Sequence, residues 1–376
     1  MKNILIVSSK SSDFGGLELH VLDLIKCFSK EHRVFVICPN GSLVEEYKKN
    51  GANVILKVPN SPADFSFAFY IKNFCKKNNI NVIHAHELIS AQGLLGGFLA
   101  GVPVRIWHVH TPFLMWQHKN FVIKIIKNTI NFVVNFFISN FIATKVIALT
   151  PQIKNFIVKK EFVVSSKVVV IPNAVNTSFF KNLPNSNQIK IIKNKYNIPH
   201  SKIIIGNMSR TSAEKGQIYL LKAFNLLNKK YPNKFFLLLA GGGDLEQSFV
   251  KYSNTHFKGD YLITGKFKEE EKINLLSVMD LFVFPSIAEG FGYVLVEAMA
   301  ANKVVISSDL PVLKHVGGEG VYYFKSKNFN DLYATIHKVV NEDPNQLKNK
   351  LNSNSNQILK FSLKSFKNNY SRVYGL

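Results

Sequence analysis

Residues 281–300 read LFVFPSIAEGFGYVLVEAMA. An apolar run at 281–284 is followed by a turn that holds two glycines, and then by a helix-forming segment that should start near Gly292. Strand, turn and helix in this order form the repeating unit of parallel α/β sheets. Because such sheets bind ligands at the carboxyl ends of their strands, the turn at 285–292 is expected to face a ligand.

The same alternation recurs along the chain. Short runs rich in Val, Ile and Phe are separated by longer amphipathic stretches, a pattern typical of buried parallel strands joined by helices. The first half contains NILIVSS (3–9), RVFVIC (33–38), NVIHAH (81–86), VRIWHVH (104–110), KVIALT (145–150) and KVVVIPN (167–173). The second half contains KIIIGNMS (202–209), FFLLLAGG (235–242), YLITG (261–265), LFVFPS (281–286) and KVVISS (303–308). We predict an α/β protein with two doubly wound, Rossmann-like domains.

A segment rich in Asn and Pro, residues 172–201, separates the two sets of strands. We place the domains at 1–180 and 181–359, and expect a helix in 360–376 that packs back on the first domain. The cleft between two such domains is the expected binding site.

The residue composition limits the classes of molecule that the protein is expected to bind. The 376 residues include 47 basic and 24 acidic side chains, a formal net charge of +23, which indicates phosphate-bearing partners such as nucleotides, nucleic acid or anionic lipids. Nucleic acid is disfavoured because arginine is scarce and the aromatic residues lie mainly in apolar runs. The three cysteines suggest neither a disulfide framework nor a zinc site. With no secretory signal and no uninterrupted apolar run long enough to span a bilayer, a cytoplasmic location is expected.

Two cations follow the first strand of the second domain. In SRTSAEKG, Arg210 and Lys215 flank a turn that leads into a helix. At the ligand-binding edge of a sheet they could hold a diphosphate through charge-assisted hydrogen bonds of about 1.5–3 kcal/mol each. A solvated loop with ordinary surface charges is the alternative.

Two carboxylates flank the glycine turn at 290–292. Glu289 precedes the helix, and Glu297 lies roughly 8 Å further along its axis, about the span from a diphosphate to a ribose. The helix start attracts phosphate, so Glu289 could contact the attached sugar and Glu297 the ribose diol. Alternatively, Glu289 caps the helix and Glu297 is a surface residue.

These motifs, together with the glycine turn AGGGDLE at 240–246, resemble the signature of the glycosyl transferases group 1 family, which are retaining, nucleotide-sugar-dependent enzymes with the GT-B fold. The spacing Glu289 to Glu297 carries most of the resemblance. It implies catalytic roles for Glu289, Arg210, Lys215 and a histidine of the first domain. It also implies donor binding by Arg210, Lys215 and Glu297 and by the turn residues Gly290, Phe291, Gly292, Tyr293 and Val294.

The first domain has its own candidates. The family resemblance places Gly16 near the donor and Gly15 near the acceptor, although a plain strand-to-helix turn is a serious alternative for Gly15. It places His110 against the donor sugar. His86 and Glu87 could touch the acceptor, although a structural histidine is an equally good reading.

The chain contains two His-x-His pairs, His84 with His86 and His108 with His110. We interpret the two members of each pair as lying on opposite faces of their strand, with His108 packed in the sheet. One metal ion could not then reach both members, and no metal site is expected.

Residues 88–160 contain no Asp or Glu but several basic residues. The central part is an aromatic-rich amphipathic helical region suited to an anionic membrane surface, with Trp116, Lys119 and Phe121 as candidate contacts. Phe132, Val133, Phe136 and Phe137 are expected to be buried instead on the first sheet. The predicted location is thus peripheral, at the inner face of the cell membrane.

The resemblance implies transfer of a sugar from a UDP- or GDP-sugar to an acceptor hydroxyl or lipid-linked saccharide, with retention of configuration. Cell-surface polysaccharide, lipopolysaccharide or glycolipid synthesis is the expected setting. The chain lacks an Asp-x-Asp motif, so no metal or other cofactor is expected and Arg210 and Lys215 would stabilise the leaving diphosphate. A nucleotide-sugar 2-epimerase of the same fold and a basic nucleic-acid-binding protein are the alternatives. A Rossmann dehydrogenase is least favoured, because its glycine fingerprint is missing.

Overall fold

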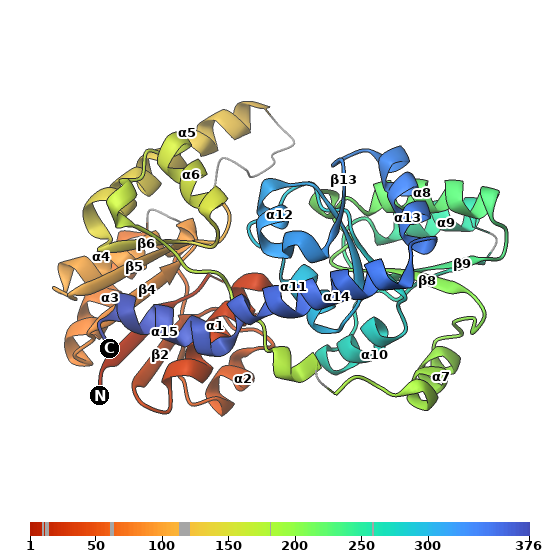
Figure 1. Ribbon diagram of the computed structural model, residues 1–376. Helices are drawn as coiled ribbons and strands as arrows, with labels where there is room; N and C mark the ends of the chain where they lie inside the picture. Colours follow the sequence, from red (N-terminus) through yellow and green to blue (C-terminus); the bar gives the residue numbers. More distant parts are fainter. Residues whose placement is uncertain (10, 12–14, 61–63, 113–120, 181, 258) are drawn as a thin grey trace. The chain divides into compact units, whose positions relative to one another are not determined.

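The computed structural model describes residues 1–376 except 10, 12–14, 61–63, 113–120, 181 and 258 (Figure 1). The chain forms two compact units. Unit 1 comprises Met1–Ala174 and Leu363–Leu376, and unit 2 comprises Val175–Ser362. The boundaries predicted from the sequence, at 180 and 359, thus lie six and three residues from those of the structure.

Unit 1 is built on a parallel sheet. In the described residues its strands are β1 (Asn3–Val7), β2 (Arg33–Cys38), β3 (Asn53–Leu56), β4 (Val82–His86), β5 (Val104–Val109), β6 (Lys145–Ala148) and β7 (Val168–Val170). They lie in the order β3-β2-β1-β4-β5-β6-β7. The connecting helices are α1 (Gly16–Phe28), α2 (Val44–Lys49), α3 (Phe65–Lys77), α4 (Ala91–Leu99), α5 (Phe121–Phe137) and α6 (Pro151–Lys160).

The last helix of the chain, α15 (Leu363–Tyr374), completes the core of unit 1. Its apolar face places Phe366, Tyr370 and Tyr374 in the same buried cluster as α1 and the strands, each at 2% exposure or less. Three large aromatic side chains at a helical spacing of four residues hold this helix against the body of the unit.

Unit 2 repeats the architecture. In its described part the strands are β8 (Ile203–Met208), β9 (Phe235–Ala240), β10 (Tyr261–Ile263), β11 (Leu281–Phe284), β12 (Val304–Ser308) and β13 (Tyr322–Phe324), in the order β10-β9-β8-β11-β12-β13. The helices are α7 (Ser186–Lys195), α8 (Gln217–Lys230), α9 (Glu246–His256), α10 (Lys272–Ser277), α11 (Tyr293–Ala300), α12 (Pro311–Gly317), α13 (Phe329–Val340) and α14 (Pro344–Ile358). The two parallel sheets confirm the predicted Rossmann-like fold class.

The strand orders determine where ligands can bind. In each unit the first strand lies between its second and its fourth, so the direction of winding reverses between β1 and β4 and between β8 and β11. Doubly wound sheets bind ligands at the carboxyl ends of the strands on either side of this reversal. A ligand is therefore expected to contact the loops after β1, β4, β8 and β11.

Candidate functional site

Lys215 lies between β8 and α8. It ends a short 3-10 turn and is followed by Gly216, the residue before α8. Gly216 has φ of 64°, and a Cβ there would lie 2.2 Å from the carbonyl oxygen of Pro285. Only glycine fits this conformation and this close approach. The loop after β8 therefore packs directly against the loop after β11.

Glu289 joins the same two loops through its side chain. Lys215 Nζ lies 2.5 Å from Glu289 Oε1, and Ser286 Oγ donates to the same oxygen at 2.9 Å. The Lys215 and Glu289 side chains are 19% and 10% exposed. The residue that caps α11 is Gly292, with no side-chain capping bond. Glu289 is thus a partner of Lys215 and not a helix cap.

Arg210 occupies the outer part of the loop after β8. Its side chain is 71% exposed, and Nη2 lies 3.5 Å from Glu214 Oε1. Since this contact is long and exposed, it restrains the guanidinium only weakly. Arg210 is consequently available to a solvent-borne anion, whereas Lys215 is already paired.

The glycine run after β9 supports this loop. Gly241 has φ of 131° and Gly243 has φ of 154°. A Cβ on Gly241 would lie 2.1 Å from the carbonyl oxygen of Ser209, and one on Gly243 would lie 2.7 Å from that of Thr211. The backbone after β9 therefore packs tightly against the backbone that presents Arg210.

The turn before α11 presents backbone more than side chains. Gly292 has φ of 94° and α11 begins at the next residue, close to the predicted start. The ring of Phe291 is buried, with its centroid 5.3 Å from that of Phe361, so Phe291 can offer a ligand its backbone and not its ring. Among the other turn residues, Gly290 and Gly292 are buried, and Tyr293 and Val294 are half-buried. The first N–H groups of a helix have no acceptors within it, and this turn displays them at the sheet edge.

Glu297 is buried, so the interpretation as a surface residue is wrong. It is 6% exposed, and its Oε1 accepts a hydrogen bond from Lys272 Nζ at 2.8 Å. Lys272 also pairs with Glu269, at 2.5 Å. Within the described residues, Oε2 of Glu297 is a buried oxygen without a hydrogen-bond partner. A buried acceptor without a donor is costly, and a ligand hydroxyl would satisfy it.

The two neighbouring carboxylates favour the charged ammonium of Lys272. Burial alone would lower the pKa of Lys272, but Glu297 and Glu269 outweigh it and the pKa is raised. Burial raises the pKa of Glu269, an effect that Lys272 partly offsets. Neither Lys272 nor Glu269 was predicted from the sequence. Their run KEEEKINLL is polar and charged, and nothing in it shows which cation is turned inward.

In unit 1 the predicted residues gather at the carboxyl ends of β1, β4 and β5. Gly15 and Gly16 stand at the start of α1. Glu87 follows β4 with φ of 64°, an uncommon conformation for a residue with a Cβ. His86 and His110 lie side by side, with Nδ1 of the first 3.0 Å from Nε2 of the second. The structure therefore brings these residues to the edge where the sheet reverses.

The prediction that each His-x-His pair divides between two faces is wrong. The rings of His84 and His86 stack with centroids 4.2 Å apart, and those of His108 and His110 at 4.1 Å. Residues two apart on a strand share a face, which is why the pairs stack. His20 of α1, which the sequence did not single out, packs against all four rings.

Part of the expected membrane segment lies outside the described residues. This applies to Trp116 and Lys119, and also to the side chain of Phe121. The expectation of burial is wrong for Val133 and Phe137, which are 47% and 55% exposed. Phe132 and Phe136 are half-buried. One face of α5 is therefore apolar and open.

Among the described residues, none of the helices combines the length and the apolar character needed to cross a bilayer.

Two family profiles match the chain. "Glycosyl transferases group 1" matches residues 188–357, and "Glycosyltransferase Family 4" matches residues 14–179. The two matched regions fall in unit 2 and mainly in unit 1, respectively.

Individual proteins agree with these profiles. The capsular polysaccharide biosynthesis glycosyltransferase CapH of Staphylococcus aureus is 26% identical over 324 residues, covering 84% of this chain and 82% of CapH. Alpha-monoglucosyldiacylglycerol synthase of Acholeplasma laidlawii is 25% identical over 295 residues, covering 73% and 72%. The crystal structure of Anabaena Alr3699/HepE in complex with UDP superposes with a TM-score of 0.83 at 18% identity, covering 100% of each chain, which is a likeness of fold.

Proposed function

This chain belongs to the glycosyl transferases group 1 family, and we propose that it moves a sugar from a nucleoside diphosphate to an acceptor hydroxyl with retention of configuration. The observation that carries the proposal is the ion pair of Lys215 with Glu289 at the reversal point of unit 2. It holds a cation and a carboxylate next to exposed Arg210 and the start of α11, a constellation suited to a diphosphate and the sugar attached to it.

We assign the diphosphate to Arg210, Lys215 and the first amides of α11. These groups would stabilise the negative charge that develops as the sugar leaves, without a proton transfer to the phosphate. Glu289 then has two roles: it accepts hydrogen bonds from sugar hydroxyls, and it fixes the ammonium of Lys215 through the 2.5 Å contact. Gly290, Gly292 and the backbone of Phe291 let the phosphates approach closely.

For the nucleoside we assign the ribose to Glu297. Its unpartnered Oε2 can accept from a ribose hydroxyl, while Lys272 holds Oε1 in place. UDP and GDP are the donors to test, and the UDP bound to the structural neighbour HepE favours starting with UDP-sugars.

In unit 1 we keep the assignments that the family resemblance implies, His110 for the donor sugar, Gly16 for the donor and Gly15 for the acceptor, and we keep Glu87 as a further acceptor contact. His86 is 0% exposed, so we assign it the structural role that was the alternative. The positive φ of Glu87 supports this placement, because strained residues concentrate at binding sites. CapH and the Acholeplasma enzyme act in capsular polysaccharide and glucosyl-diacylglycerol synthesis. A cell-surface saccharide or glycolipid acceptor is accordingly proposed.

A panel of nucleotide sugars and nucleoside diphosphates tests the proposal by thermal shift, followed by product analysis with saccharide acceptors. A ligand at 100 times its Kd stabilises the fold by about 2.7 kcal/mol, enough to stand out among non-binders. We expect one donor to raise Tm and to yield a product only when acceptor is added. Acceptor-independent conversion of the donor would instead indicate the epimerase.

Two substitutions of Glu297 separate its expected effect on nucleotide binding from its expected effect on protein stability. Glu297→Gln should weaken nucleotide binding about tenfold by calorimetry, because an amide replaces one carboxylate oxygen with a donor. Glu297→Ala should also lower the free energy of unfolding by about 3 kcal/mol, since Lys272, 8% exposed, loses one of its two carboxylates. Equal nucleotide affinity in Glu297→Gln and wild type would remove the ribose assignment.

We also propose that unit 1 binds an anionic membrane surface through α5 and the helical turn Ile138–Ile142. Exposed apolar side chains recur at helical spacing along this face: Ile130, Val133, Phe137 and Phe141, at 55%, 47%, 55% and 62%. Unit 1 also exposes lysines: Lys127 on α5, and Lys159 and Lys160 at the end of α6. Exposed apolar side chains combined with lysines suit an interface of anionic lipid.

Replacing Phe137 and Phe141 together with Ser should reduce sedimentation with phosphatidylglycerol-containing liposomes at least tenfold, because both rings are exposed and contribute little to the core. The matched control is Phe65→Ser with Phe69→Ser, two exposed rings on α3 at 62% and 56%. If both double variants sediment like the wild type, α5 is not the membrane contact.

A further inference from the structure

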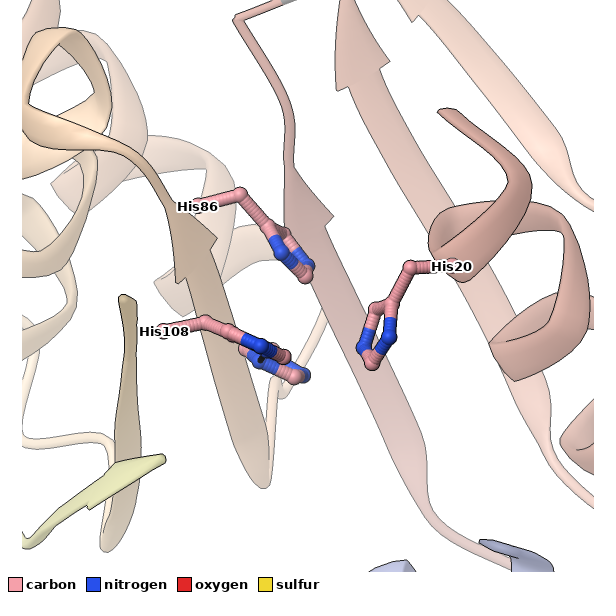
Figure 2. A group of neighbouring side chains, drawn as sticks. His20, His86 and His108 are labelled. Atoms are coloured by element: carbon pink, nitrogen blue, oxygen red, sulfur yellow. Dashed lines mark hydrogen bonds between the residues drawn. The ribbon is translucent and has the colours of Figure 1, made fainter. Parts of the chain in front are cut away.

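Unit 1 contains a buried cluster of imidazoles beneath the proposed acceptor edge. His20 projects from α1, His84 and His86 from β4, and His108 from β5, and each is 0% exposed. Figure 2 shows His20, His86 and His108 pointing toward one another from these three elements. One nitrogen from each of the four rings can be chosen so that all four lie within 4.8 Å of one another.

The spacing of these four nitrogens is close to the spacing of ligands around a bound metal ion. Four atoms within 4.8 Å of one another fit inside a sphere of radius about 2.9 Å, whereas zinc–nitrogen bonds are about 2.0–2.1 Å. Each nitrogen would need to move by about 0.9 Å or less to reach a common centre.

Outer partners hold several of these rings by one nitrogen. Nδ1 of His20 lies 2.7 Å from Oδ1 of Asn173, which can only accept, so Nδ1 carries the hydrogen and Nε2 carries the lone pair. That lone pair lies 3.3 Å from the hydroxyl of Tyr370, a long contact that a metal ion would replace. Nδ1 of His84 lies 2.6 Å from the hydroxyl of Tyr374. Histidine ligands of metals characteristically use their second nitrogen for such a contact, which fixes the tautomer and the orientation of the ring.

Two further nitrogens of the cluster lack a hydrogen-bond partner in the described part of the chain. Nε2 of His86 and Nε2 of His108 are buried atoms without a hydrogen-bond partner within the described residues. Buried polar atoms are nearly always satisfied, and two orphans in one cluster are costly. Burial also lowers the pKa of His20 to about 3 and holds the pKa values of the other three well below 6.5. The rings are therefore neutral, the form that binds metal.

We propose that His20, His84, His86 and His108 form a structural site for a transition-metal ion of the zinc type. Imidazole nitrogen suits zinc, whereas Mg²⁺ and Ca²⁺ require oxygen ligands. Four protein ligands leave no open position, which is the arrangement of structural zinc sites. The ion would tie α1 to β4 and β5, and it does not take part in sugar transfer.

Metal analysis of the wild-type protein is the first test. The tag-free full chain, grown with zinc and passed through gel filtration, should carry about one zinc per chain by mass spectrometry. After chelation, added Co²⁺ should give the visible absorption of a four-coordinate nitrogen site. Added zinc should raise Tm by about 5–10 °C at 100 times its Kd. A folded wild-type chain that retains no zinc and gives no such cobalt spectrum overturns the proposal.

Substitutions locate the site. His20→Gln and His108→Gln keep a polar side chain but remove the ring, and each should lose the bound zinc and the cobalt spectrum. His256→Gln, which replaces an exposed histidine of unit 2, is the control and should retain both. If a folded His20→Gln or His108→Gln protein keeps full zinc stoichiometry, the proposal is wrong. Should either variant fail to fold, the wild-type cobalt spectrum decides.

Discussion

Glu289→Gln is expected to lower kcat by about 10²–10³ while changing the donor Kd less than threefold. The amide has the shape of the carboxylate but no charge, so it no longer fixes the ammonium of Lys215, which now lies 2.5 Å away. Loss of one preorganised electrostatic contact at a reacting centre typically has this effect. Steady-state kinetics with the donor identified by thermal shift measure it, and calorimetry gives the Kd separately.

The control is Glu319→Gln, which removes an exposed carboxylate of unit 2 outside the proposed site. Its kcat should equal that of the wild type. A Glu289→Gln enzyme that also retains full kcat would show that this carboxylate does not act at the transition state, although the family assignment would stand.

Acidification is expected to destabilise the metal-stripped protein progressively between pH 6.5 and 5. Burial lowers the pKa of His20 to about 3, and the pKa values of His84, His86 and His108 are also well below 6.5. Unfolding exposes these rings and returns their pKa values to about 6.5. Below pH 6.5 the unfolded chain therefore binds protons that the folded chain does not, and stability falls as the pH falls.

The expected loss in the free energy of unfolding is large. At pH 5 His20, with its pKa lowered to about 3, contributes a loss of about 2 kcal/mol, and His84, His86 and His108 add to the loss in the same direction. The hydrogen-bonded carboxyls of Asp64 and Glu271 have pKa values of about 2, so their contribution is lost only at lower pH. Urea titrations from pH 7 to pH 5, followed by circular dichroism, give the free energy of unfolding. His256→Gln should leave the slope unchanged, and a flat profile in the wild type would contradict the buried neutral cluster.

Much of the fold could be predicted because central strands are long apolar runs. β1, β2, β8 and β9 are buried along nearly their whole length, so their hydrophobicity is continuous. Two strands were missed, β3 and β13, with four and three residues at the edges of their sheets. The equally short edge strands β7 and β10 were predicted, because their apolar runs VVV and YLI stand out from polar neighbours. β3 is exposed at both ends and so carries little of the buried-strand signal on which prediction relies.

The candidate site was predictable where local sequence determines it. Gly292 and the start of α11 follow from glycine chemistry and helix propensity, and Arg210 and Lys215 from their place after a strand. The network of Glu297 with Lys272 was not predictable, because the two residues lie 25 positions apart and meet only through packing. The histidine cluster was misread for a simpler reason: the two-residue period of a strand puts both members of each pair on one face.

The most direct test of the central claim is a crystal structure of the protein soaked with UDP, GDP or the donor that raises Tm most. The account predicts the diphosphate at the start of α11, within hydrogen-bond distance of Arg210 and Lys215, with the ribose at Glu297 and the sugar at Glu289. A diphosphate bound elsewhere, with the Lys215–Glu289 pair and the α11 amides untouched, would contradict it.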